Sequence, residues 1–341
     1  MKIRIAINGF GRIGRAFFKL AVLRDDIAIV AVNDLGNAEN LAYLLKYDSV
    51  YGKSDLVVEV LDNALRVNGK EIAFLSSKDP AELPWGDMGI DVAVEATGVF
   101  ASYEKAKVHL AAGAKRVVVS APVKDDPGAA GVIGATVLMG VNEDKLKTCQ
   151  ITSNASCTTN AGSPIIAILD ETIGIEKAML NTAHGYTATQ PTVDGPSGKD
   201  FRRGRAAAVN IIPTSTGAAI ATTKAHTQLE GKFDGVALRV PVAAGSIADI
   251  TFLAKRDTSV EEVNNILREA AKNPLWEQYF TVVEDPVVST DIIGDTHASI
   301  ADLSMTRVVG GNLVKVLAWY DNEMGYAHAL AEHVVKTGSY A

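Results

Sequence analysis

The segment Gly9-Phe10-Gly11-Arg12-Ile13-Gly14 decides the fold of the first half of this chain. It follows Ile3–Asn8, whose apolar residues predict a β-strand, and it opens Arg12–Arg24, whose apolar spacing predicts a helix. Between a strand and a helix, the first glycine permits a tight turn, the second lets a ligand approach the backbone, and the third lets the helix pack on the strand. The spacing also fits a plain glycine-rich turn, so the surrounding sequence has to decide.

The strand and helix pattern continues beyond this turn. Ile27–Asn33 is a second predicted strand, and its consecutive apolar residues are typical of a strand buried on both faces of a parallel sheet. The first half is therefore expected to form an α/β domain with a Rossmann-type parallel sheet and helices on both sides. The remaining elements predicted here are strands at Val57–Val60, Asp91–Glu95 and Arg116–Ser120, a helix at Ser102–Ala112 and a surface loop at Lys124–Ala135.

The second half is richer in strands, which favours a mixed or antiparallel sheet and an α+β domain. A helix is predicted at Ser259–Ala271, with Ser259 as its N-cap and Glu262 completing a capping box. We expect a first domain of residues 1–156 and 320–341, whose last helix, Glu323–Lys336, packs back on it, and a second domain of residues 157–319. The strands predicted in the second half are Lys177–His184, Gly235–Val242, Ile247–Lys255 and Asn312–Tyr320.

Composition narrows the class of protein. The chain has 341 residues with a net charge of -7, which argues against a uniformly basic nucleic-acid binder. Two cysteines cannot form a disulfide scaffold and suit a reducing compartment. The sequence has neither the apolar start of a secretory signal nor an apolar run of the ~18 residues that a membrane span needs. A soluble cytoplasmic protein without a membrane partner is expected.

Asp34 strengthens the interpretation of the glycine segment. It ends the second predicted strand, 20 residues after Gly14, which is the distance at which an acid meets the ribose hydroxyls of a dinucleotide. The amides at the start of the helix would then face the pyrophosphate. A carboxylate at this place repels a 2′-phosphate, so NAD is favoured over NADP. The alternative is that Asp34 is only a turn residue between Asn33 and Gly36.

The most informative stretch in the second half is Ser153-Asn154-Ala155-Ser156-Cys157-Thr158-Thr159-Asn160. Small polar residues surround Cys157 just before an apolar run, which places it in the first turn of a predicted helix. The helix dipole is expected to lower the pKa of the thiol, and the free amides there could stabilise an oxyanion. Cys149, in a strand-like run, is expected to be an inert core thiol.

A nucleophilic thiol needs a base, and His184 is the best placed of six histidines. It ends a predicted strand and enters a polar segment, whereas His109 and His333 lie in predicted helices and are expected at the surface. Nothing in the sequence alone places His184 beside Cys157.

Anion-binding candidates follow. Arg239 lies within an apolar strand, which indicates an anionic partner, either a ligand or an acid such as Asp249 in a structural ion pair. The turn Pro213–Gly217 offers hydroxyls. The basic run Lys199–Arg205 fits a solvated loop, a subunit contact, an anion or cofactor site or, less well in so acidic a chain, a nucleic-acid contact.

In combination, these motifs resemble the phosphorylating glyceraldehyde-3-phosphate dehydrogenase family over essentially the whole chain. The most specific matching stretch is SNASCTTN with Cys157 at its centre. The other matching stretches are INGFGRIGR from Ile7, LLKYDSVYG from Leu44, ATGVF from Ala96, HGYTATQPTVDGPSGKDFRRGRAAA from His184, IIPTSTGAA from Ile211, RVP from Arg239 and WYDNEMGY from Trp319.

The resemblance implies an activity and a role for each matching residue. Glyceraldehyde 3-phosphate would be oxidised with NAD and inorganic phosphate, in glycolysis or gluconeogenesis, by a homotetramer that needs no metal and no nucleic acid. Cys157 would be the nucleophile and His184 the base. Thr187 and Arg239 would bind the substrate phosphate, and Ser156, Thr158, Thr216 and Gly217 the attacking phosphate. The residues implied for NAD are Gly9, Gly11, Arg12, Ile13, Gly14, Asp34, Lys78, Ser120 and Asn322.

The sequence also departs from the family pattern. Ala161 replaces a common second cysteine, Ile220 a common lysine, and Gly185 a usual Ser or Ala. Val242–Gly245 replaces the usual Thr-Pro-Asn-Val near Arg239. Two alternatives stay open: an erythrose-4-phosphate or non-phosphorylating aldehyde dehydrogenase of the same chemistry, and a non-catalytic binding protein on this scaffold.

Overall fold

The computed structural model describes residues 2–198 and 200–341, so Lys199 of the basic run lies outside the described residues. The chain forms two compact units. Unit 1 comprises the chain up to Ala155 together with Leu330–Ala341, and unit 2 comprises Ser156–Ala329.

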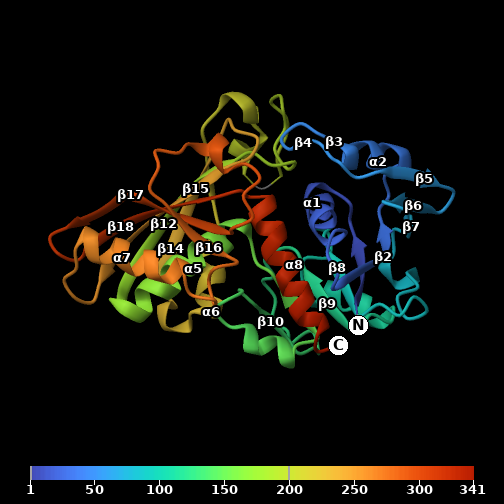
Figure 1. The fold of residues 1–341 in the computed structure, drawn as a ribbon, viewed down its shortest axis with the longest axis horizontal. Helices are drawn as coiled ribbons and strands as arrows, with labels where there is room; N and C mark the ends of the chain where they lie inside the picture. The colour runs from blue at the N-terminus through green and yellow to red at the C-terminus, as the bar shows by residue number, and fades with distance from the viewer. Residues whose placement is uncertain (1, 199) are drawn as a thin grey trace. The chain divides into compact units, whose positions relative to one another are not determined.

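Unit 1 is built on a nine-stranded sheet in the order β10-β11-β9-β8-β1-β2-β7-β6-β5. Its pairs are parallel from β10 to β7, as expected, and β6 and β5 extend it in antiparallel fashion. The central strand β1 lies between β2 and β8, where the chain changes direction across the sheet, and this is the place where open α/β sheets bind ligands. The strands are β1 Ile3–Asn8, β2 Ile27–Asn33, β5 Val58–Leu61, β6 Ala64–Val67, β7 Lys70–Leu75, β8 Val92–Glu95, β9 Arg116–Val119, β10 Gly134–Thr136 and β11 Ile151–Ser153 (Figure 1).

The helices of unit 1 are shorter than the sequence predicts. The predicted helix Ser102–Ala112 is divided at Lys107 into two short helices. The predicted surface loop Lys124–Ala135 is wrong in its second part, because Ala130 is buried and Gly134 begins strand β10. The elements are α1 Arg12–Ala21, α2 Ala38–Lys46, α3 Tyr103–Ala106 and α4 Val108–Ala111, the turns η1 Pro80–Glu82 and η2 Glu143–Lys147, and the ribbon β3 Tyr47–Asp48 with β4 Gly52–Lys53.

Unit 2 is built on a seven-stranded mixed sheet in the order β13-β14-β12-β15-β18-β17-β16, which agrees with the expectation. Leu180 on β12 packs beneath Gly162 of α5, and Figure 1 shows α5, α6 and α7 gathered beside this sheet. The strands are β12 Ile175–Gly185, β13 Ile212–Ser215, β14 Phe233–Val240, β15 Ser246–Ala254, β16 Phe280–Val283, β17 Ser299–Val309 and β18 Leu313–Tyr320.

Serine side chains cap two helices of unit 2, α5 and α7. The Ser259 side chain caps α7 by accepting from the amide of Glu262, as predicted, although the Glu262 carboxylate bonds to Thr258 and Arg256. The helices are α5 Cys157–Thr172, α6 Ala218–Ala225 and α7 Val260–Ala271, with turns η3 Phe201–Gly204, η4 Ala207–Val209, η5 Thr227–Leu229 and η6 Ser289–Ile292. The last helix, α8 Met324–Gly338, continues from unit 2 into unit 1.

Two predictions about histidines are wrong. His109 and His333, expected at the surface, are both fully buried in unit 1. His109 bonds to Trp85 and Glu95, and His333 to Thr152 and Asn154. Their partners come from distant parts of the sequence, so helical position alone does not reveal their burial.

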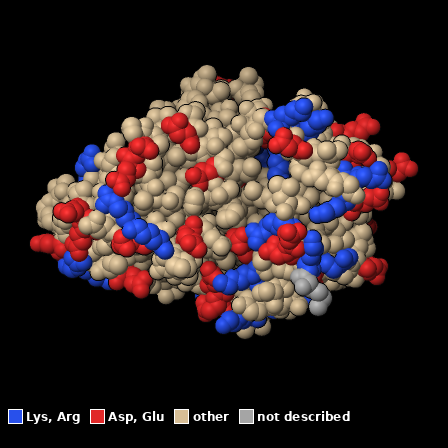
Figure 2. Space-filling model, in the orientation of Figure 1, with Lys and Arg blue, Asp and Glu red and all other residues tan. Residues whose placement is uncertain are grey.

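None of the helices in the described part of the chain combines the length and the apolar character that a membrane crossing requires. On the face shown in Figure 2, basic side chains are interspersed with acidic ones. The basic run follows this pattern, because Arg202 pairs with Asp200 and Arg205 with Asp194.

Candidate active site

Cys157 is the first residue of α5, as predicted. Ser156 is the N-cap, and its hydroxyl oxygen accepts from the amide of Thr159. Ala155 just before it is buried and has a φ of +54°, a left-handed conformation that costs a non-glycine residue about 1 kcal/mol or more. The sharp turn from β11 thus delivers a half-buried thiol to the N-terminal end of a helix, where free amides point outward.

His184 lies beside this thiol. Its Nε2 is 3.2 Å from the Cys157 sulfur, and its Nδ1 is 2.6 Å from the carbonyl oxygen of Gly185. A carbonyl can only accept, so His184 donates to it in the tautomer that carries the proton on Nδ1. That tautomer leaves the Nε2 lone pair facing the thiol, which is the arrangement of a nucleophile and its base.

Arg239 is the third member of the cluster. It is aligned with His184 across the parallel pair of β12 and β14, and its Nη1 donates to the same Gly185 oxygen at 3.0 Å. Nη1 also lies 2.6 Å from His184 Nδ1, and because an arginine N–H can only donate, it competes with the Gly185 carbonyl for that ring nitrogen. The proposed ion pair with Asp249 is wrong, because that carboxylate binds Lys315 at 2.6 Å. Within the described residues, no carboxylate pairs with Arg239, so its half-buried charge is available for an anion.

Burial is the largest influence on the pKa values of His184 and Cys157. It lowers the pKa of His184 to about 3, and the positive charge of Arg239 acts in the same direction. It raises the pKa of the Cys157 thiol, although Arg239 and the amide of Thr158 oppose that shift. The expected fall in the thiol pKa is therefore wrong for this state of the protein. The favourable helix terminus is present, but it does not outweigh desolvation.

A hydroxyl chain lies beneath the cluster. Thr182 donates to the carbonyl of Ile247 at 3.0 Å and lies 2.8 Å from the Tyr320 hydroxyl, which lies 2.9 Å from Thr158 Oγ1. The Tyr320 ring meets His184 edge-on, with centroids 5.9 Å apart. Sequence reasoning missed Tyr320 and Thr182, because nothing in the local pattern reveals that these hydroxyls meet. The buried Thr158 side chain is thus already engaged, and its backbone amide acts on the Cys157 thiol.

The residues expected at the two phosphate sites lie in two groups. Thr159 Oγ1 contacts both Ser156 Oγ and the carbonyl of Ala218, so the start of α5 lies beside the turn that contains Thr216 and Gly217.

Thr187 belongs to the second group. Its hydroxyl lies 3.0 Å from that of Thr189, to which Arg203 donates. The charge of Arg203 adds to burial in lowering the pKa of Arg239, so two cations converge here.

Asn322 is buried in unit 2 near Gly185. Ser246 Oγ accepts from the Gly185 amide at 3.1 Å, so it donates its own proton to Asn322 Oδ1 at 2.9 Å. The Asn322 side chain therefore keeps its N–H groups for a ligand. Ser246 is a second residue that sequence reasoning missed.

Unit 1 contains a cavity of about 420 Å³ at the carboxyl edge of its parallel strands. Gly9 has a φ of +100°, and a Cβ there would lie 2.6 Å from the Thr97 amide nitrogen. A Cβ on Gly14 would lie 2.1 Å from the Gly9 carbonyl oxygen, whereas Gly11 is open. The cavity is lined by Asn8, Gly9, Gly11, Asn33, Asp34, Leu35, Ser77, Lys78, Pro80, Ala96, Thr97, Val99 and Phe100.

These features fit a dinucleotide. The Asp34 carboxylate accepts from the amides of Phe10 and Gly36, both at 2.7 Å, which fixes it at the cavity wall with acceptor capacity to spare. Arg12 and Ile13 are the first two residues of α1. The Arg12 side chain itself pairs with Asp48.

Of the remaining residues expected to hold NAD, Lys78 lines this cavity, and Ser120 and Asn322 are not in its lining. Lys78 is exposed at the cavity, while Ser120 follows β9 and has a buried hydroxyl without a protein partner among the described residues. Asn322 lies in the other unit. In the described residues, no group of three or more potential metal ligands is found.

Comparison with known proteins identifies the family. Residues 3–103 match the glyceraldehyde 3-phosphate dehydrogenase NAD binding domain, and residues 156–322 match the glyceraldehyde 3-phosphate dehydrogenase C-terminal domain. Glyceraldehyde-3-phosphate dehydrogenase 2 of Streptomyces avermitilis is 45% identical over 99% of both chains. The enzymes of Geobacillus stearothermophilus and Sclerotinia sclerotiorum are 46% and 45% identical, over 97% and 96% of this chain and 97% and 95% of theirs. The chain therefore belongs to the glyceraldehyde-3-phosphate dehydrogenase family of NAD-dependent oxidoreductases.

Proposed function

We propose that this protein oxidises glyceraldehyde 3-phosphate to 1,3-bisphosphoglycerate, with inorganic phosphate and NAD, through a thioester on Cys157. The observation that carries the proposal is the contact of Cys157 Sγ with His184 Nε2 at 3.2 Å, with the unpaired charge of Arg239 beside them. The full-length similarity to enzymes of this name supports the choice of substrate.

The proposed chemistry follows from the cluster. His184 takes the thiol proton and the Cys157 sulfur adds to the aldehyde carbon, after which His184 returns the proton to the aldehyde oxygen to give a hemithioacetal. His184 then accepts the proton of the hemithioacetal hydroxyl as the carbon is oxidised to a thioester. NAD supplies the hydride acceptor when it is bound. Phosphate oxygen then attacks the thioester carbon, and the Cys157 thiolate leaves and regains its proton.

This proposal has two anion sites, one for the phosphate group of the substrate and one for the attacking inorganic phosphate. Arg239 and Thr187 bind the phosphate of the substrate, because the Arg239 charge has no protein carboxylate in the described residues. Ser156 and Thr158 bind the attacking phosphate with Thr216 and Gly217, at the facing ends of α5 and α6.

The cofactor would bind along unit 1. The first-turn amides of Arg12 and Ile13, with Gly9, Gly11 and Gly14, would meet the pyrophosphate, and Asp34 the ribose hydroxyls. We propose further that Lys78, Ser120 and Asn322 contribute, Asn322 through its free N–H groups. The domains of this proposal are residues 1–156 with 320–341 for NAD and residues 157–319 for catalysis.

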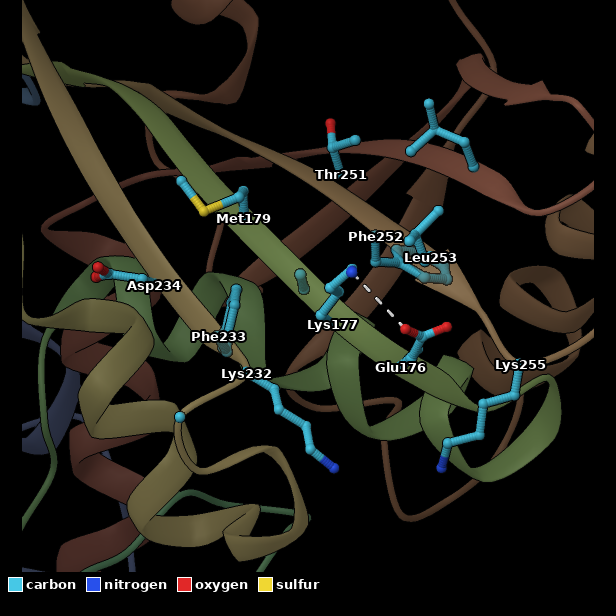
Figure 3. Close-up of a pocket in the computed structure, with 13 residues that line it drawn as sticks. Glu176, Lys177, Met179, Lys232, Phe233, Asp234, Thr251, Phe252, Leu253 and Lys255 are labelled. Carbon is cyan, nitrogen blue, oxygen red and sulfur yellow. Dashed lines mark ion pairs between the residues drawn. The ribbon is translucent and has the colours of Figure 1, made fainter.

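We also propose a homotetramer, located in the cytoplasm. One face of the unit 2 sheet is lined by alternate residues of β12, β14 and β15 that are exposed or half-exposed, among them Met179 and Val236. A pocket of about 600 Å³ lies beside these strands, and Figure 3 shows Met179, Thr251 and Phe233 among the residues that line it. Such an apolar sheet surface suits a second copy of the chain.

The proposed reaction is tested by NADH absorbance with glyceraldehyde 3-phosphate, with and without inorganic phosphate. We expect turnover that depends on phosphate and falls by about 10⁴-fold or more in C157S, because the serine hydroxyl is a far weaker nucleophile than the thiolate. NAD binding to C157S should stay near that of the unchanged protein. Erythrose 4-phosphate and NADP are the comparison substrates, and preference for either one, or turnover without phosphate, would contradict the proposal.

A further inference from the structure

Three adjacent strands of the unit 1 sheet end in buried polar residues. Asn33 ends β2, Asn8 ends β1 and Glu95 ends β8, and the register places Asn8 opposite both of the others. Their exposed fractions are 4%, 2% and 1%. A buried carboxylate is rare without a cation beside it, so the partners of Glu95 need an explanation.

The first chain of hydrogen bonds leads from a backbone amide to Glu95. The Ser77 amide donates to Asn33 Oδ1 at 2.9 Å, which identifies that atom as the acceptor. Asn33 Nδ2 therefore donates to Asn8 Oδ1 at 2.7 Å. Asn8 Nδ2 is left to donate to Glu95 Oε2 at 2.6 Å.

Two other chains lead to the same carboxylate. The indole N–H of Trp85 can only donate, and it meets His109 Nδ1 at 3.1 Å, so His109 donates through Nε2 to Glu95 Oε2 at 3.0 Å. Thr97 Oγ1 accepts from the Val99 amide at 3.0 Å and therefore donates its proton to Glu95 Oε1. The Thr97 amide donates to the same oxygen at 2.8 Å.

Glu95 thus receives four hydrogen bonds, and each chain that can be traced back starts from a group that only donates. Only a carboxylate offers four acceptor positions on two oxygens, so neither a protonated acid nor an amide can replace it without a clash of donors. The directions of all these bonds are consistent with one another only because Glu95 accepts every one of them.

This network lies in the wall of the cavity. Asn8, Asn33, Ser77 and Thr97 all line it. The Thr97 amide nitrogen also occupies the space where a Cβ on Gly9 would lie, so Thr97 and the first glycine of the turn are in direct contact. Glu95 itself reaches no cavity surface, and it acts on the cavity through its donors.

We infer that Glu95 is a positioning residue of the NAD site, which fixes the amide orientations of Asn8 and Asn33 and the position of Thr97 against the glycine turn. The inference rests on the proposed placement of NAD in this cavity. It assigns to Glu95 no contact with the cofactor and no part in the chemistry at Cys157.

The test is E95Q in the full chain, with NAD binding measured by calorimetry. The NH2 group of the glutamine must face either the hydroxyl and amide of Thr97 or the donors of Asn8 and His109. Both positions place it against N–H or O–H groups that donate. We expect the Kd for NAD to rise at least tenfold, and the KM for NAD to rise by far more than kcat falls. The control is E71Q on β7, the same change at an exposed glutamate of the same sheet, which should bind NAD as the unchanged protein does.

Recovery of NAD binding in a double variant distinguishes a positioning role of Glu95 from a general loss of stability. In N8D/E95Q the carboxylate and the amide exchange places, so the carboxylate now at position 8 can accept both from Asn33 and from the amide now at position 95. The His109 N–H still faces that amide, so the rescue is expected to be partial. The double variant should bind NAD at least threefold better than E95Q, while N8D alone, which places two carboxylates together, should bind it worse than the unchanged protein. If E95Q does not fold, T97V provides the test. It removes one hydrogen-bond donor to Glu95, and the Kd for NAD should rise about threefold.

The inference is wrong if E95Q binds NAD within twofold of the unchanged protein, or if the double variant binds no better than E95Q. It is also wrong if T97V, used in place of an unfolded E95Q, binds NAD normally. Failure of the unchanged protein to bind NAD would instead contradict the proposed function.

Discussion

At the scale of single residues, Cys157 and Cys149 differ in what surrounds them. Cys149 is 4% exposed, and burial raises its pKa, with no base in contact among the described residues. Cys157 is half-buried, starts a helix and faces His184 Nε2. The same functional group is thus expected to be inert at one position and reactive at the other.

We predict that iodoacetamide at pH 7 labels Cys157 at least about 100-fold faster than Cys149, because only Cys157 has both access and a proton acceptor. H184N should slow labelling of Cys157 by about tenfold or more and leave Cys149 unchanged. Mass spectrometry of the two cysteine peptides over time measures both rates. Equal labelling of the two thiols, or no effect of H184N, would count against His184 as the base.

The cluster shows what sequence alone can and cannot supply. The small polar residues around Cys157 predicted its helix terminus, and the strand end at His184, followed by a polar segment, indicated a place where functional sites form. The buried partners Tyr320, Ser246 and Glu95 escaped prediction, because each acts through residues that are distant in the sequence. The error about the thiol pKa has the same origin, since desolvation depends on the whole surrounding shell.

At the scale of elements, helix α8 is attached to the sheet of unit 1 by His333. His333 Nε2 is 2.7 Å from Thr152 Oγ1 on β11, and Nδ1 is 3.0 Å from Asn154 Oδ1, in the turn that precedes Cys157. Burial lowers the pKa of His333 to about 3. In the unfolded chain the same imidazole takes up a proton near its usual pKa of about 6.5.

The stabilising contribution of neutral His333 is therefore complete above pH 6.5 and falls as the pH drops from 6.5 toward 3. Linkage predicts a loss of about 1.5 kcal/mol in the free energy of unfolding between pH 6.5 and pH 5 from this residue. H333Q should be less stable than the unchanged protein at pH 7.5 but should lose less stability on acidification. Urea unfolding at pH 6.5 and pH 5 checks this, with H297Q as the control, and an unchanged pH dependence in H333Q would refute it.

Regular elements were predictable where local signals agree. The predicted bounds of β1 and β2 match the structure, because apolar runs end at polar residues and turns. Strand β17 was not predicted, since Asp302, Ser304 and Arg307 interrupt its apolar pattern and a bulge shifts its register. Its pairing with β18 and β16 compensates for a weak local propensity.

At the scale of the whole molecule, the exposed face of the unit 2 sheet determines assembly in our proposal. Met179 and Val236 are 57% and 50% exposed on β12 and β14. Exposed apolar side chains on a wide sheet favour association, because burying them against another copy removes their area from water.

We predict that M179E/V236E forms smaller assemblies than the unchanged protein, since two carboxylates would be buried without partners. Light scattering after size exclusion should give about four times 36.0 kDa for the unchanged protein and a lower mass for the variant. L23E, at an equally exposed leucine of unit 1, is the control and should keep the original mass. A monomeric unchanged protein would refute the tetramer, and an unaltered mass in the variant would remove this face from the interface.

The segment Val242–Gly245 constrains which side chains its neighbours can carry. The Val242 carbonyl accepts from the Tyr186 amide, and a Cβ on Gly185 would lie 3.0 Å from that carbonyl. Gly245 in turn has a φ of +84° and lies where a Cβ would meet the Ser289 carbonyl at 2.4 Å. The bare backbone at 185 and the position of the Val242 carbonyl are thus mutually dependent, because a methyl group added at 185 would require that carbonyl to shift by a few tenths of an ångström.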